Sequence, residues 1–152
     1  MIHLHGTVRY GPGWMATVEL DRELGRYYHS LIPKYLDAKP QAHGTHCTLV
    51  RLGRESPCLT DWLYRDGERV ELRYLPLIHY RAPYFYLEAF SPEMGEIRLR
   101  LGLPEYREGF SCYHITIANT KRLAGSAVSL RRCSVSLETT WALRSSNAIL
   151  ER

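Results

Sequence analysis

Two short segments of the chain carry the same pattern, a histidine and a threonine separated by one residue and followed by an apolar pair. The pattern residues are His46 and Thr48 in the first segment and His114 and Thr116 in the second. In an extended strand successive side chains point to opposite faces, so each histidine shares a face with its threonine. If the two strands lie near each other in one sheet, two imidazoles and two hydroxyls converge above it.

This set of side chains is suited to cleaving a phosphodiester without a metal. Histidine titrates near neutrality, so one imidazole can act as a base and the other as an acid. Threonine hydroxyls can donate hydrogen bonds to the phosphate oxygens, where negative charge gathers. The acid and the base must flank the scissile bond on opposite sides, which explains a requirement for two copies. One His-x-Thr carries little information, whereas two copies 68 positions apart, in two similar halves, are much more specific.

Two other interpretations of the same residues stay open. The histidines could be ordinary strand residues with backbone partners, and the threonines could simply be β-branched strand formers. A metal site is the second alternative, because His43, Cys47 and Cys112 are also of metal-ligand types. Against it, Cys47 must point away from His46, and no pair of these residues has zinc-finger spacing.

The strands that must position the motifs are predicted from alternating apolar and polar residues. The two motif strands are expected over residues 45–51 and 112–119. Further strands are expected within 2–10, 14–20, 69–80, 84–89 and 128–143.

Two helices are predicted from capping signals. Asp21 can cap the first helix, and Ser91 followed by Pro92 is a typical start for the second. Four residues after the first cap recur at helical spacing and are predicted to pack against the core. They are Tyr27, Tyr28, Leu31 and Tyr35.

The order of the predicted elements indicates an α+β architecture, because helices separate antiparallel strands and the two halves echo each other. A chain of 152 residues is expected to form a single domain over 1–152. The formal net charge of +4 fits a small anionic ligand and is weak for wrapping long nucleic acid. The start of the sequence does not resemble a signal peptide, no run is long enough to cross a membrane, and the cysteines form no CxxC pair. We therefore expect a cytoplasmic protein without a membrane partner.

On its two motifs the chain resembles the 2H phosphoesterase superfamily, whose signature is a pair of His-x-Thr/Ser-x motifs. The matching segments are His46-Cys47-Thr48-Leu49 and His114-Ile115-Thr116-Ile117. The resemblance covers most of the chain. It implies a bilobal, pseudo-symmetric α+β fold in which antiparallel sheets are flanked by helices and the active-site cleft lies between the lobes. It also implies that the two histidines and two threonines are catalytic and bind phosphate, with no metal and no cofactor.

Within that superfamily, the short chain and the stretches 6–12 and 27–34 are similar to the phage anti-CBASS phosphodiesterases. Those proteins degrade cyclic di- and trinucleotide signals of bacterial immunity. The likeness implies a cyclic di- or trinucleotide as the ligand, a ribose 2′-hydroxyl as the nucleophile, and a bacterial host cytosol. It also suggests that Tyr10, Trp14 and Trp141 stack on bases and that Glu138 contacts a base edge or orients a histidine. A monomer or small homo-oligomer is expected.

Two other functions remain open on the sequence. One is a phosphoesterase that acts on RNA ends or tRNA, opening 2′,3′-cyclic phosphates or 2′-5′ bonds. The other is a non-catalytic protein that binds a cyclic nucleotide and releases it intact. Complete motifs in both halves count against a pure binder, which has no need for two poised proton donors and acceptors.

Overall fold

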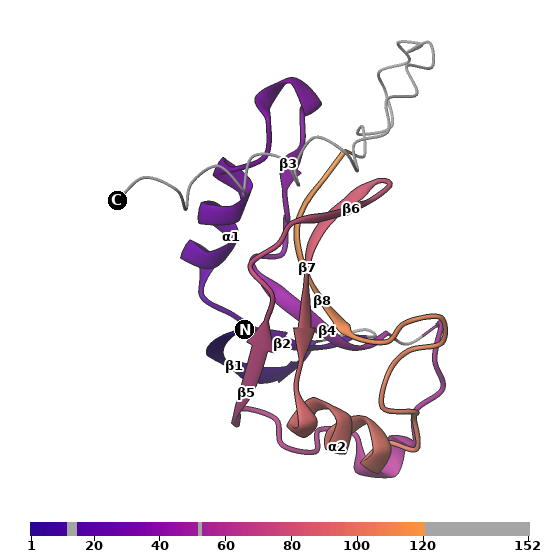
Figure 1. The fold of residues 1–152 in the computed structure, drawn as a ribbon. Coiled ribbons are helices and arrows are strands. Elements are labelled where there is room, and N and C mark those ends of the chain that lie inside the picture. The colour runs from indigo at the N-terminus through magenta and orange to yellow at the C-terminus, as the bar shows by residue number, and fades with distance from the viewer. Residues whose placement is uncertain (12–14, 52, 121–152) are drawn as a thin grey trace. The chain divides into compact units, whose positions relative to one another are not determined.

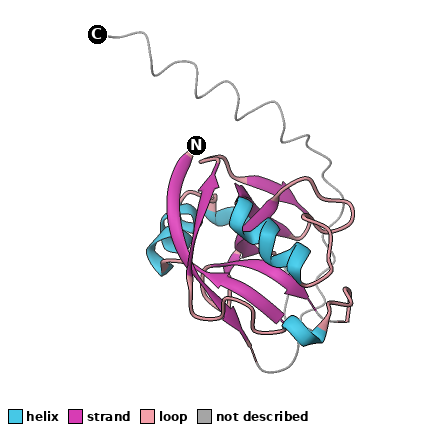
Figure 2. Cartoon of the chain, turned by 90° about the horizontal axis from the view of Figure 1, so that it is seen from below, coloured by secondary structure: helices cyan, strands magenta, loops and turns pink. Residues whose placement is uncertain are grey.

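The computed structural model describes residues 1–11, 15–51 and 53–120, in which strands are the main elements (Figures 1 and 2). Two 3₁₀ turns, Lys34–Leu36 and Leu59–Asp61, lie between them. The strands and α-helices in chain order are β1 (Ile2–Tyr10), β2 (Met15–Glu19), α1 (Arg22–Ser30), β3 (Lys39–Pro40), β4 (His46–Arg51), β5 (Arg69–Tyr74), β6 (His79–Arg81), β7 (Tyr84–Phe90), α2 (Pro92–Arg100) and β8 (Tyr113–Asn119).

Six of the strands close into an antiparallel barrel. The sheet order is β3-β8-β4-β2-β1-β5-β7-β6, and β7 also pairs with β8, so the ring β8-β4-β2-β1-β5-β7 has no free edge. The closing ladder runs from Tyr84 opposite Asn119 to Ala89 opposite Tyr113. β3 and β6 are added to this ring, on β8 and β7 respectively.

The predicted bilobal α+β fold, with sheets flanked by helices, is therefore wrong. The β7–β8 ladder and the β4–β8 pairing join the two motif-bearing halves into one continuous ring, so they cannot be separate lobes. The described residues contain two α-helices of nine residues each, too few to flank two sheets. Figure 2 shows how small the helical share of the described part is beside the strands.

Alternation along the strands separates the core from the site. Cys47 and Leu49 on β4 and Ile115 on β8 are fully buried, and they belong to one continuous apolar cluster. The residues that alternate with them, His46 and Thr48 on β4 and His114 and Thr116 on β8, point to the opposite face of their strands. The core therefore fixes which way the motif side chains point, because a slip of one residue would bury the polar set.

Both predicted helix starts are confirmed. The Asp21 carboxylate accepts a hydrogen bond from the Glu23 backbone N–H at 2.8 Å, which caps α1. The Ser91 hydroxyl accepts one from the Met94 N–H at 3.2 Å, with proline at the first position of α2. α1 packs against β8 and β3, and α2 packs against β4 and β5.

The prediction that four apolar residues of the first helical segment pack on the core holds for one of them. Tyr28 is 5% exposed, and its ring meets Tyr74 edge-on with 6.0 Å between the ring centroids. Tyr27, Leu31 and Tyr35 are exposed. The helix ends at Ser30, so helical spacing does not carry Leu31 and Tyr35 onto the buried face.

Two further sequence predictions concern membrane-spanning segments and the strands expected near the end of the sequence. In the part of the chain that the structure describes, no helix combines the length and the apolar composition needed to cross a membrane. The strands predicted within 128–143 lie outside the described residues.

Candidate active site

The two motif strands are neighbours in the ring, and the central residues of the two motifs pair with each other. Extending this antiparallel register by one residue in each direction places His46 opposite Thr116 and His114 opposite Thr48. The two histidines then stand at diagonal corners of a four-residue set. In an ideal antiparallel ladder such diagonal neighbours are about 7–8 Å apart, which leaves room for a phosphate group between them.

All four motif residues line one cavity of about 610 Å³. That volume lies within the range typical of small-molecule sites. The cavity is built over neighbouring strands, with residues from β4, β8 and β7 among its lining. The expected cleft between two lobes is therefore replaced by a cavity on the face of the sheet that points away from the apolar cluster.

His46 has its tautomer fixed by the backbone. Its Nδ1 lies 3.0 Å from the carbonyl oxygen of Gly44, which can only accept, so Nδ1 carries the proton and Nε2 is left with a lone pair when the ring is neutral. Gly44 adopts a φ of +77°, a left-handed conformation that suits glycine. The turn before β4 thus sets the orientation of the ring.

Burial lowers the pKa of His46 from its ordinary value of 6.5. The side chain keeps 7% of its exposure, so its charged form is poorly hydrated. The Gly44 carbonyl and Glu19 act in the opposite direction, while His43 adds to the lowering. The net result favours a neutral imidazole near pH 7, the form a general base requires.

His114 sits between two aromatic rings. The centroid of its ring is 4.2 Å from that of Tyr86, and 4.9 Å from that of Phe110, which approaches edge-on. Glu88 lies directly opposite His114 across the β7–β8 ladder. Burial lowers the pKa of His114 below 6.5, Glu88 opposes this, and Arg81 contributes to the lowering. The negative charge of Glu88 therefore favours the protonated form of the His114 imidazole.

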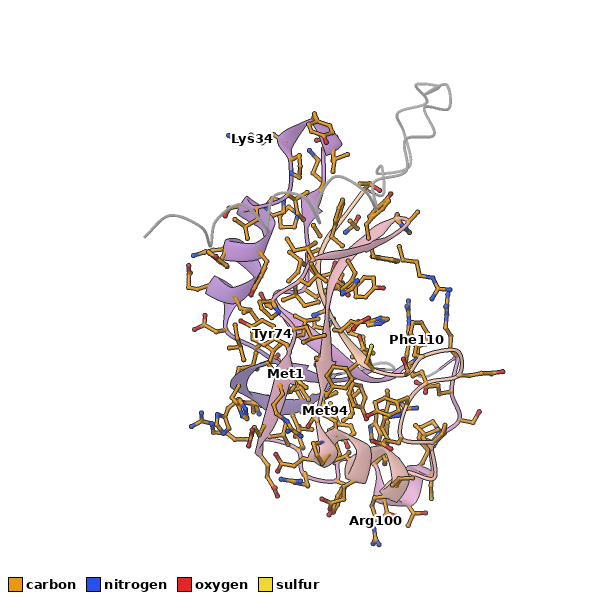
Figure 3. The ribbon with its side chains drawn as sticks, in the orientation of Figure 1. Met1, Lys34, Tyr74, Met94, Arg100 and Phe110 are labelled. Carbon is orange, nitrogen blue, oxygen red and sulfur yellow. The ribbon has the colours of Figure 1, made fainter. Side chains whose placement is uncertain are left out.

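Four arginines also line the cavity, and none of its described lining residues is an aspartate or glutamate. Phe110, labelled in Figure 3, has nitrogen-bearing side chains near it. The guanidinium carbons of Arg81 and Arg107 are 5.8 and 5.6 Å from the centroid of its ring, within the range of cation–π contacts. With Arg51 and Arg54, these residues gather positive charge around the cavity.

The Glu55 carboxylate contacts both the side chain of Arg107 and the backbone of Arg51. Glu55 accepts a hydrogen bond from the Arg51 backbone N–H at 3.0 Å and lies 3.5 Å from Arg107 Nε. It also pairs at 2.7 Å with Arg98, whose side chain is fully buried. This network ties the segment after β4 to α2 and supports one wall of the cavity.

Of the four residues predicted to contact bases, Tyr10 alone belongs to the described residues. Tyr10 does not line the cavity; its hydroxyl donates to the Tyr64 carbonyl at 2.9 Å, and its ring packs edge-on against Trp62. Its contacts are those of a packing residue. Trp14, Glu138 and Trp141 lie outside the described residues.

The sequence pattern did not point to the arginines or to Phe110, because they come from separate segments. One signal was available: the alternation over Tyr84–Phe90 places Tyr84 and Tyr86 on a face opposite to that of the buried Phe85 and Leu87. Both tyrosines line the cavity. Among the described residues, no group of three or more histidine, cysteine or acidic side chains is placed to hold a metal ion.

Comparisons with protein-family models, with curated proteins and with solved structures found no match for this chain. The site itself therefore carries the functional argument.

Proposed function

We propose that this protein is a metal-independent phosphodiesterase that cleaves 3′-5′ linkages in cyclic di- or trinucleotides by the paired-histidine chemistry of the 2H phosphoesterase superfamily. One observation carries the proposal: two His-x-Thr motifs on neighbouring strands present all four polar side chains to one cavity lined by arginines. A bacterial cytosol, where such immune signals act against phage, is the proposed place of action.

In the proposed reaction, His46 Nε2 removes the proton from a ribose 2′-hydroxyl. The freed oxygen attacks the adjacent phosphorus, so a bond forms between O2′ and phosphorus as the bond from phosphorus to O5′ breaks. His114 donates its proton to the leaving O5′. The product ends in a 2′,3′-cyclic phosphate. The fixed Nδ1–H of His46 and the carboxylate opposite His114 support this division of roles.

The other polar groups of the cavity would stabilise the charge. The hydroxyls of Thr48 and Thr116 can donate to the two non-bridging phosphate oxygens, on which charge builds in the transition state. The arginines supply positive charge that offsets the phosphates of a cyclic dinucleotide without a metal ion. A single phosphate would leave much of this positive charge unpaired, which favours a ligand with several phosphates.

The test is a chromatographic assay of 3′-5′ cyclic di- and trinucleotides with the purified protein in the presence of EDTA. We expect linear products, and a loss of turnover of about 10²–10⁴-fold in either His46→Gln or His114→Gln. The matched control is His3→Gln, because His3 is exposed on β1 and does not line the cavity. Far-UV circular dichroism checks that each variant keeps its fold.

Intact substrate after prolonged incubation would rule the proposal out, as would full activity in both cavity variants. RNA with a 2′,3′-cyclic end is run in parallel. Faster turnover of that RNA than of every cyclic oligonucleotide would reassign the substrate to RNA ends. Binding of a cyclic dinucleotide without any product would reassign the protein to a non-catalytic binder.

A further inference from the structure

A second cavity of about 450 Å³ adjoins the first on the side of α1. The first half of the helix contributes Arg22 and Arg26 to its lining. The two cavities share three lining residues, Gln41, His43 and Thr116. Thr116 is one of the motif threonines, so a ligand that filled both cavities would lie next to this member of the proposed catalytic set.

The second cavity is cationic. None of its described lining residues is an aspartate or glutamate. Arg22 has no ion pair among the described residues, while Arg26 pairs with Glu23 at 2.5 Å on the exposed side of the helix. This lining suits an anionic group, and the free guanidinium of Arg22 is the strongest donor it offers.

A glycine allows the helix to bring these arginines close to the motif strand. A Cβ atom at Gly25 would overlap the hydroxyl oxygen of Thr45, the residue immediately before His46. Gly25 lies between Arg22 and Arg26 in sequence, and all three line the same cavity. The close approach therefore places the guanidinium-bearing face of α1 beside the start of β4.

We propose that the second cavity binds a second phosphate of an oligonucleotide whose scissile phosphate lies at the motif residues. This inference rests on the proposed function and deepens it. Positive charge then lies on both sides of Thr116, from Arg22 and Arg26 on one side and from the four arginines of the first cavity on the other. The ligand class is a nucleotide with at least two phosphodiesters, and nucleotides with one phosphate occupy only half of the site.

The test is a binding measurement with probes that the proposed reaction cannot cleave, because they lack the 2′-hydroxyl nucleophile. Isothermal titration compares 2′-deoxy 3′-5′ cyclic dinucleotides of adenine and guanine with the corresponding 2′-deoxy 3′,5′-cyclic mononucleotides. The protein is the full chain, either wild type or the double variant Arg22→Gln/Arg26→Gln. The matched control is Arg69→Gln/Arg73→Gln, which removes the same charge from β5, outside both cavities.

We expect the α1 variant to raise the dissociation constant of the two-phosphate probe by a factor at least about ten times larger than for the one-phosphate probe. The loss of a charge-assisted hydrogen bond predicts an effect of this size. The β5 control should change the dissociation constants of the two probes by similar factors. Equal weakening of the two probes by the α1 variant would overturn the inference, as would failure of the two-phosphate probe to bind the wild type. The cleavage assay decides the proposed function separately, so cleavage combined with either of these results would refute the second phosphate site alone.

Discussion

At the scale of single residues, the two motif histidines have identical sequence patterns and different surroundings. His46 is held by a backbone carbonyl, with its second nitrogen free. His114 is held between Tyr86 and Phe110 and lies opposite Glu88. Enzymes that use two like groups as acid and base separate their roles through such differences in environment. The different surroundings of the two histidines can be tested through the pH dependence of kcat/KM.

We expect the alkaline limb of the kcat/KM profile to lie below pH 6.5. Burial lowers the pKa of both His46 and His114, so the acid loses its proton below the ordinary value for histidine. Above this limb, kcat/KM should fall about tenfold per pH unit, since a single proton is required on the acid. Initial rates between pH 4.5 and 8 measure the profile.

The variant Glu88→Gln should move that limb to still lower pH. Glu88 raises the pKa of His114, while Arg81, Arg107 and His79 lower it, so neutralising the carboxylate removes the opposing influence. Glu68→Gln, on the segment before β5 and outside the cavity, is the control and should leave the limb in place. A limb in the wild type above pH 7, or no shift in Glu88→Gln, would contradict the assignment of His114 as the acid.

At the scale of elements, α2 is fastened to β4 by one buried side chain. Arg98 is 0% exposed and donates to the carbonyls of Leu49, at 2.6 Å, and Pro104, at 2.8 Å. Its remaining guanidinium nitrogen pairs with Glu55, the carboxylate that also serves the backbone of Arg51. The stability of α2 and the placement of the cavity wall therefore depend on the same contacts.

Replacing Arg98 by methionine should lower the free energy of unfolding by about 3–5 kcal/mol, because two carbonyls lose their donor and the Glu55 carboxylate loses one of its cationic partners. Urea denaturation followed by circular dichroism measures the change. The control is Arg100→Met, since Arg100 is 60% exposed where it pairs with Asp61 and should cost about 1 kcal/mol or less. Equal midpoints for the two variants would show that the buried network contributes nothing specific.

Local features of these elements could be predicted from the sequence, and their long-range pairing could not. The caps at Asp21 and Ser91 are signals carried by a few neighbouring residues, and both helices begin as expected. Ring closure depends on β7 meeting β8, which no local pattern encodes. The burial of Arg98 is similarly hidden, because an arginine beside apolar helix positions is typical of a surface residue.

The residues of the candidate site also divide into those that could be predicted from the sequence and those that could not. His46, Thr48, His114 and Thr116 were predictable because alternation within each strand fixes which side chains share a face. The arginines that line the cavity come from segments far apart in sequence, including the loop after α2 that carries Arg107. Their convergence is a property of the closed ring.

At the scale of the whole molecule, the arrangement of charge matters more than its total. The formal net charge is +4, which alone indicates little. The described acidic residues avoid both cavities, whereas six arginines line them. Carboxylates are placed instead around Arg65, which contacts Glu68, Glu93 and Glu96 away from the cavities. The described part of the chain therefore concentrates its positive charge at the proposed site.

That field predicts a strong dependence of catalysis on salt. Screening shortens from about 10 Å at 0.1 M to about 3 Å at 1 M ionic strength, so kcat/KM for a cyclic dinucleotide should fall about tenfold over this range, mainly through KM. Arg51→Gln/Arg54→Gln should flatten the dependence, because these arginines have no ion pair among the described residues and line the cavity. Arg69→Gln/Arg73→Gln removes equal charge elsewhere and should keep the wild-type slope. The wild-type kcat/KM could instead stay constant over this range of ionic strength, with the thermal unfolding midpoint also unchanged by salt. That result would show that the ligand is not held by these charges.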